Sequence, residues 1–363
     1  QARLALTRWP GELPNSLWDY GAELSYMSTL VDYWRTEYDW RGQESLINKY
    51  SHFKAVIGGQ PIHFIHERGK GPAPLPLIIS HGWPGSFYEF MEIIGPLTDP
   101  ASHGGNPDDS FDVVIPSLPG FGFSGTTKER QVNVAQIADW FAVLMREVLG
   151  YERYGAQGGD WGSMISSRLG YAYTSEVCGI HLNMVGVAPH PERRHALSNA
   201  EKEFLKNMGQ WQREETGYQM IQGTKPQTLA YALNDSPVGL CAWIIEKFRT
   251  WSDCDGFVEN SYTKDQLLTN VMIYWVTQTF NSASRIYYEE RHHPWRLGVD
   301  EKVMAPTGVA VFPKEMARAP REWVERAYNL CHWSPMPAGG HFAAMENPKL
   351  LVADIRNFFR DLR

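Results

Sequence analysis

An aspartate lies in a stretch whose glycines are spaced for a sharp turn from strand to helix. The stretch runs Tyr154-Gly-Ala-Gln-Gly-Gly-Asp160-Trp-Gly-Ser163, with Gly158 two residues before the aspartate and Gly162 two residues after it. In a nucleophile elbow the residue at the turn has a strained backbone, so only very small residues fit at those two positions. An ionised aspartate can attack a saturated carbon directly and form an ester on the protein. The alternative is that Asp160 only caps the following helix, and this stretch alone leaves both interpretations open.

A histidine and a glutamate further along the chain are the partners that an aspartate nucleophile would need. His341 follows two glycines in a loop near the C-terminus, and Glu315 follows directly after the strand expected at 306–312. We prefer Glu315 to Glu346, which is too close to His341 in the sequence to reach behind the imidazole ring. A histidine alone is more often structural, but the order nucleophile, acid, histidine is that of the α/β-hydrolase fold.

The elements that would hold these residues alternate between strand and helix. Short apolar runs predict buried strands, and apolar residues at intervals of three or four predict amphipathic helices between them. This alternation predicts an α/β protein with a mostly parallel central sheet and helices on both of its faces. Together with the order of the three residues above, it favours the α/β-hydrolase fold. The strands are expected at 77–80, 112–116, 154–158, 179–184, 306–312 and 330–333, and the helices at 133–149, 322–328 and 348–359.

Two regions depart from this alternation and suggest a division of the chain. Residues 1–74 contain a helix expected within 24–40 and a hairpin at 52–67 around Gly58-Gly59, which predicts an N-terminal lobe that wraps the core. Residues 189–295 show only helical periodicity, with a capping box at Ser198-Asn-Ala-Glu201 and helices expected at 228–233, 238–251 and 265–280. We expect this block to form a helical cap over the carboxyl ends of the strands. The hydrolase core would then consist of residues 75–188 and 296–363.

The composition excludes several classes of protein. The 363 residues are 43% hydrophobic and 21% charged, as in ordinary globular proteins, and the net charge of -7 argues against a nucleic-acid partner. Four scattered cysteines suggest neither a metal site nor a disulfide framework. Without an apolar run long enough to span a bilayer, we expect a soluble, cytoplasmic protein. The chain begins at Gln1, so the sequence leaves open a preceding signal or membrane anchor.

In several ordered motifs the chain resembles the epoxide hydrolases of the microsomal type, including their N-terminal region. Each motif is short, but together they extend over most of the sequence in the family's order. They are His81-Gly-Trp-Pro-Gly85, Gly158-Gly-Asp-Trp-Gly162, Gly217-Tyr-Gln-Met-Ile-Gln222 with Thr224-Lys-Pro226, Leu233-Asn-Asp-Ser-Pro-Val238, Phe312-Pro-Lys-Glu315 and Gly339-Gly-His-Phe-Ala-Ala344.

The resemblance implies a role for each member of the triad. Asp160 would be the nucleophile, His341 the base that activates water, and Glu315 the acid that orients the histidine. The backbone amides of Trp83 and Trp161 would form the oxyanion hole. An apolar epoxide and water would give a vicinal diol through an aspartyl ester, without a cofactor or a metal.

The resemblance also implies two cap tyrosines that hold the epoxide oxygen. Tyr218, in the Gly-Tyr-Gln-Met stretch, and Tyr287, in Arg285-Ile-Tyr-Tyr288, match those positions. A phenol that donates a proton compensates for the poor leaving-group quality of the oxygen. Tyr288 competes with Tyr287 for the second position, and the alternative for each ring is core packing.

Two other functions remain open on the sequence alone. A haloalkane or haloacid dehalogenase would use the same aspartyl ester, and the indole N–H of Trp161 would suit a halide. The paired tyrosines would then have no role, and Trp83 stands where haloalkane dehalogenases usually have asparagine. A non-catalytic binding protein of the same fold tends to lose triad members, whereas all three remain here. The sequence does not distinguish a homodimer from a monomer.

Overall fold

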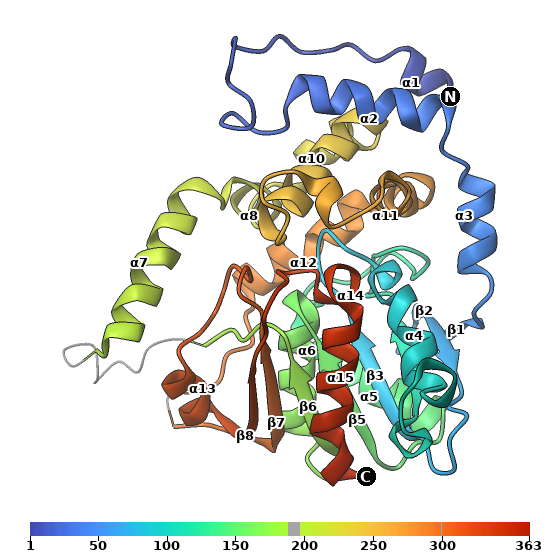
Figure 1. Cartoon of the computed structure of the whole chain (residues 1–363), viewed down its shortest axis with the longest axis vertical. Coiled ribbons are helices and arrows are strands. Elements are labelled where there is room, and N and C mark those ends of the chain that lie inside the picture. The colour runs from blue at the N-terminus through green and yellow to red at the C-terminus, as the bar shows by residue number, and fades with distance from the viewer. Residues whose placement is uncertain (188–196, 299) are drawn as a thin grey trace.

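A single eight-stranded sheet organises the chain. The computed structural model describes residues 1–187, 197–298 and 300–363 (Figure 1). The strand order is β1-β2-β4-β3-β5-β6-β7-β8, and every neighbouring pair is parallel except β1 with β2 and β2 with β4. The strands are β1 His52–Ile57, β2 Gln60–Glu67, β3 Leu75–Ser80, β4 Phe111–Pro116, β5 Tyr154–Gly158, β6 Val177–Leu182, β7 Val303–Val311 and β8 Tyr328–Pro335.

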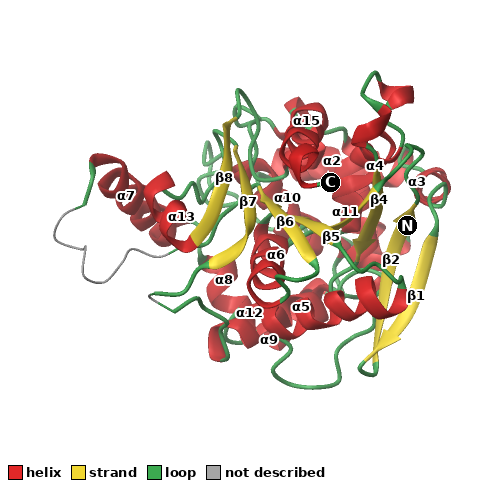
Figure 2. Cartoon of the chain, turned by 90° about the horizontal axis from the view of Figure 1, so that it is seen from below, coloured by secondary structure: helices red, strands yellow, loops and turns green. Residues whose placement is uncertain are grey.

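Helices cover both faces of this sheet, as the alternating sequence pattern predicted. Figure 2 shows α4 and α15 on one side and α5 and α6 on the other. Because both faces are covered, β3 is buried except at Pro76: Leu77 and Ile79 face the α4 and α15 side, and Ile78 faces the other. The bounds are α4 Met91–Thr98, α5 Val134–Val143 continued by a π-helical turn Leu144–Val148, α6 Asp160–Ala172, α13 Arg321–Ala327, α14 Ala343–Glu346 and α15 Pro348–Phe359.

The described residues between β6 and β7 form helices only. Most of these helices lie above the sheet in the view of Figure 1, on the side where the parallel strands have their carboxyl ends, while the first of them runs down the left of the picture. The predicted capping box at Ser198 and Glu201 is present. The helices are α7 Asn199–Glu214, α8 Gly217–Gln222, α9 Pro226–Leu233, α10 Pro237–Trp251, α11 Lys264–Thr277 and α12 Phe280–His292.

The N-terminal residues extend over these helices. Helix α2, Leu24–Thr36, lies across α10 in Figure 1, and α3, Trp40–Ile47, leads down to the β1–β2 hairpin. The hairpin was predicted, with Gly58 and Gly59 both at positive φ in its turn. A further short helix, α1, spans Ala2–Ala5. No helix among the described residues is long and apolar enough to cross a bilayer.

Two expected helices turn out to be interrupted. The helix expected within 24–40 divides into α2 and α3, because Asp39 takes an extended conformation and its side chain caps α3. The helix expected at 265–280 ends at Thr277, where Gln278 adopts a left-handed conformation with φ of 55°, and α12 begins two residues later. The domain boundaries at 74 and 295 stay predictions, and the boundary at 188 lies outside the described residues.

A buried carboxylate ties the last helix to the sheet. Asp354 of α15 accepts hydrogen bonds from His181 of β6 at 2.9 Å and from His332 of β8 at 2.8 Å. Burial raises the pKa of Asp354, but the histidines and Ser334 outweigh burial and lower the pKa to about 2. Because the carboxylate is favoured in the folded protein, this group stabilises the fold above its unfolded pKa of about 4 and stops doing so as the pH falls toward 2.

We therefore expect Asp354→Asn to lower the free energy of unfolding at pH 7 by about 2–3 kcal/mol, the usual worth of hydrogen bonds to a charged group. Urea denaturation at pH 7 and pH 3 measures the change, which should be smaller at pH 3. The exposed Asp361, replaced by Asn, is the control and should change stability by less than about 0.5 kcal/mol. An equal loss for the two variants would contradict the role of Asp354.

Candidate active site

Asp160 stands at a strained turn between β5 and α6. Its φ is 49°, in the left-handed region that a residue with a side chain rarely adopts. The glycine requirement predicted for an elbow is met. A Cβ on Gly162 would lie 1.8 Å from the carbonyl oxygen of Ser80, and a Cβ on Gly158 would lie 2.2 Å from the Gly162 backbone. The neighbouring strand therefore leaves room for this turn only because both positions are glycine.

Two backbone amides hold the carboxylate of Asp160. The amide of Trp83, in the loop after β3, donates to Oδ1 at 2.9 Å, and the amide of Trp161 also donates to this side chain. Gly82 permits the approach, because a Cβ there would lie 2.1 Å from Oδ1. Burial raises the pKa of Asp160, while His341 and the two amides act to lower it. Two donors directed at one carboxylate are what the expected oxyanion hole requires, and that role stays a prediction.

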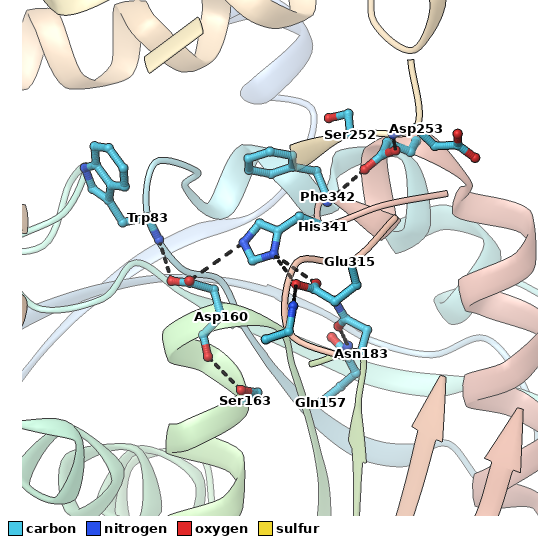
Figure 3. A network of polar contacts seen from close by, with 12 residues as sticks. Trp83, Gln157, Asp160, Ser163, Asn183, Ser252, Asp253, Glu315, His341 and Phe342 are labelled. Atoms are coloured by element: carbon cyan, nitrogen blue, oxygen red, sulfur yellow. Dashed lines mark hydrogen bonds and ion pairs between the residues drawn. The ribbon is translucent and has the colours of Figure 1, made fainter. Parts of the chain in front are cut away.

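His341 lies between Asp160 and Glu315 (Figure 3). Its Nδ1 donates to Glu315 Oε2 at 2.9 Å, and its Nε2 is 3.7 Å from Asp160 Oδ2. Burial lowers the pKa of His341, but the charge and hydrogen bond of Glu315 and the charge of Asp160 outweigh burial and raise the pKa to about 9. The amide of His341 donates to the carbonyl of Trp251 at 2.9 Å, which fixes the loop after β8 against α10. At neutral pH the imidazole is therefore a cation between two carboxylates.

Glu346 does not contact the imidazole in this way. Its carboxylate accepts from the amides of Asp253 and Phe342, at 2.8 and 2.9 Å, and burial raises its pKa to about 7. Glu315, at the end of β7, is the acid that the structure brings to Nδ1 of His341. The preference for Glu315 on grounds of sequence distance agrees with this geometry.

Tyr218 and Tyr287 both lie against the residues that surround Asp160. Tyr218, from α8, stacks on Trp83 with ring centroids 5.0 Å apart, and Tyr287, from α12, packs edge-on against Trp161 at 4.8 Å. The two tyrosine rings are 5.7 Å apart. Burial is the main cause that raises the pKa of each phenol, with the Asp160 charge adding to it, so both stay protonated as hydrogen-bond donors. Tyr288 instead stacks on His292 and is 38% exposed.

Nothing in the described part of the chain suggests a metal. No group of three or more His, Cys, Asp or Glu side chains there is arranged to bind an ion. The four cysteines are all free. The site offers carboxylates, an imidazole, phenols and aromatic walls.

Two charged residues near the site had not been singled out from the sequence. Glu89 lies beside Gly82 and interacts with His341 and Asp160. Lys247 of α10 places its ammonium group 5.3 Å from the centre of the Tyr218 ring and pairs with glutamates. Ser86-Phe-Tyr-Glu89 reads as a helix cap, and Lys247 falls within an ordinary helical period, so neither pattern pointed to the site.

Comparisons with known proteins give the family and the fold of the chain. Residues 1–90 match a family model described as the epoxide hydrolase N terminus, and residues 76–348 match the alpha/beta hydrolase fold. A putative epoxide hydrolase of Stigmatella aurantiaca is 42% identical over 99% of this chain and 81% of its own length. Epoxide hydrolase 1 of Oryctolagus cuniculus is 40% identical over 98% of this chain and 84% of its own.

Solved structures give the same result. The juvenile hormone epoxide hydrolase of the silkworm Bombyx mori superimposes with a TM-score of 0.90 at 32% identity, over 100% of this chain and 91% of that one. The epoxide hydrolase of Aspergillus niger gives a TM-score of 0.86 at 29% identity, over 100% and 92%.

The charge balance at His341 predicts the effect of removing its acid. Because Glu315 is the largest influence that raises the pKa of His341 and burial opposes it, Glu315→Gln should lower that pKa well below 9. Asp160→Asn should lower it less. Titration of histidine-labelled protein followed by NMR measures each value. The exposed Glu322, replaced by Gln, is the control, and an unchanged His341 pKa in Glu315→Gln would contradict this account.

Proposed function

This chain belongs to the epoxide hydrolases of the α/β-hydrolase fold, and we propose that it hydrates an epoxide through an ester formed on Asp160. Epoxide and water are its substrates, and a vicinal diol is the product. The proposed mechanism rests mainly on the surroundings of the Asp160 carboxylate. Two amides already hold Asp160, of which Trp83 contacts Oδ1, while His341 faces Oδ2.

The first step is attack of the Asp160 carboxylate on an epoxide carbon. The carbon–oxygen bond of the ring breaks, and the ring oxygen takes up negative charge that a neutral donor must stabilise. The buried phenols of Tyr218 and Tyr287 supply that donor. Because the pKa of each phenol is raised, the phenol stays protonated until negative charge develops on the ring oxygen. One proton passes from a phenol to the oxygen, and an alkyl ester of Asp160 with a free hydroxyl group remains.

Ester formation also changes the state of His341. In the resting protein the Asp160 charge is one of the causes that raise the pKa of this histidine. An ester is neutral, so that contribution disappears when the ester forms, and the imidazole gives up its proton more readily. The proton that it releases balances the one that the phenol has lost. His341 is thereby a cation during attack and a base afterwards.

The second step is hydrolysis of the ester. Water transfers a proton to His341 Nε2 while its oxygen attacks the carboxyl carbon of Asp160, and Glu315 stabilises the imidazolium through Nδ1. The amides of Trp83 and Trp161, already directed at this side chain, stabilise the oxyanion of the tetrahedral intermediate. When the intermediate collapses, the ester carbon–oxygen bond breaks and the departing alkoxide takes the proton left on the added hydroxyl, which releases the diol and restores the carboxylate.

The rings around Asp160 favour an apolar substrate. Trp83, Trp251, Tyr218 and Tyr287 form a continuous set of aromatic contacts, with centroid distances from 5.0 to 6.2 Å. Such surfaces bind hydrocarbon groups and leave the epoxide oxygen to the phenols. We infer an epoxide that carries a bulky apolar or aromatic substituent.

Isotope labelling tests the ester directly. With enzyme in excess over a styrene-type epoxide in ¹⁸O-labelled water, the first turnover should place label in the carboxylate of Asp160 and leave the diol unlabelled. The reason is that water attacks the Asp160 carboxyl carbon and not the epoxide. Mass spectrometry of the peptide that contains Asp160 measures the label, with Asp160→Asn as the control. Label found only in the diol would show that water attacks the epoxide.

The phenols should affect ring opening. Replacing Tyr218 or Tyr287 by Phe should slow ester formation by about 100-fold, the lower range for loss of a positioned acid. Stopped-flow tryptophan fluorescence can follow this step because Trp83 and Trp161 contact the phenols. Tyr288→Phe is the matched control and should stay within about twofold of the wild-type rate. Equal rates for all three variants would remove the phenols from the mechanism.

A further inference from the structure

A small cavity lies directly beside the Asp160 and His341 side chains. Its volume is about 10 Å³, enough for the centre of one water molecule. Its polar lining comes from the loop after β3, the elbow, the start of the β6–α7 connection and the loop after β8. The residues concerned are Ser80, Gly82, Glu89, Asp160, Asn183 and His341.

Part of this lining has unused hydrogen-bonding capacity. The hydroxyl of Ser80 is fully buried and has no hydrogen-bond partner among the residues that the structure describes. A buried hydroxyl without a partner costs free energy unless water satisfies it. The amide oxygen of Asn183, by contrast, already accepts from Gln157 at 2.9 Å. Ser80 therefore gives the lining a hydroxyl that a bound water could satisfy.

Glu89 adds a carboxyl group to the same cavity. It belongs to the short 3₁₀ helix η1, Phe87–Phe90, and its side chain folds back over Gly85, where a Cβ would lie 1.5 Å from Oε1. Burial raises its pKa to about 8, and the negative charge of Asp160 contributes to that shift. At neutral pH the group is therefore mainly the neutral acid, which can both donate and accept a hydrogen bond. The amides of Gly82 and Ser86 also contact it, so capping of η1 is the alternative role.

A water that attacks the Asp160 ester needs more than His341. One of its protons goes to Nε2 and one lone pair goes to the ester carbon, which leaves a second proton and a second lone pair without partners. Unless protein groups satisfy both, the water can rotate away from the attacking orientation. The carboxylic acid of Glu89 and the hydroxyl of Ser80, in the same lining, have the chemistry to do so.

We propose that Glu89 and Ser80 position the hydrolytic water in this cavity, between His341 and the ester of Asp160. The inference rests on the proposed ester mechanism. Glu89 is a positioning residue that acts through the water, and it takes no part in opening the epoxide.

The two chemical steps separate this role from a structural one. In Glu89→Gln, ester formation should stay within about twofold of wild type, while ester decay should slow by about tenfold or more. Ester should accumulate, so kcat and KM should fall together. Rapid-mixing fluorescence and quenched-flow detection of the alkylated Asp160 peptide measure the two rates. Loss of the η1 cap alone would displace the neighbouring Trp83 loop and slow both steps, and that result, or unchanged ester decay, would overturn the proposal.

Two further variants make the test specific. Ser80→Ala removes only the unpartnered hydroxyl, and it should slow ester decay severalfold without raising the unfolding temperature. A Ser80→Ala protein that unfolds at a higher temperature than wild type and hydrolyses the ester at the normal rate would mean that the hydroxyl holds no water. Glu346→Gln changes a half-buried carboxyl that contacts backbone amides and does not itself line the cavity, so it should leave the ratio of the two rates unchanged. If wild-type protein forms no ester, the proposed function fails; if the ester forms and Glu89→Gln hydrolyses it normally, only this inference fails.

Discussion

The left-handed turn at Asp160 is the constraint on which the site depends. The turn places a carboxylate at the end of β5, beyond the edge of the sheet. It fits only because Gly158, Gly162 and Gly82 have no Cβ, which would clash at each of these positions. The backbone strain is offset by the tightly paired strands β3 and β5 around it. The turn also brings the carboxylate to 2.9 Å from the Trp83 amide and to 3.7 Å from Nε2 of the imidazole.

The buried charges of the site are balanced as a set. His341 is a cation between Asp160 and Glu315, so two carboxylates share one imidazolium in a region from which water is largely excluded. Another negative charge nearby would be costly, and Glu89 responds to burial and to the Asp160 charge with a raised pKa. The protonation of each group thus depends on the others, and the proposed conversion of Asp160 to an ester would change the balance for all of them.

Much of this arrangement could be read from the sequence, because some local patterns have only one structural solution. The glycines around Asp160 predict its turn, and the capping box at Ser198 predicts the start of α7. Tertiary packing, which the local sequence pattern does not show, decides which face a residue occupies and where some helices end. Tyr287 and Tyr288 are adjacent on one helix and differ only in the face they occupy, and Gln278 breaks a helix without a glycine to signal it. Glu89 went unnoticed because a cap explains its position equally well. The catalytic roles remain predictions until the two reaction steps are measured.

The two tyrosines come from α8 and α12, whereas the nucleophile, the histidine and its acid come from loops at the ends of β5, β8 and β7. On the proposed assignment, recognition of the epoxide and turnover of the ester are thus encoded in different stretches of the gene. Mutations in the helices can therefore change which epoxides are accepted while the hydrolytic residues stay as they are. Such a division would let a lineage diversify its substrates in small steps, each of which keeps a working enzyme.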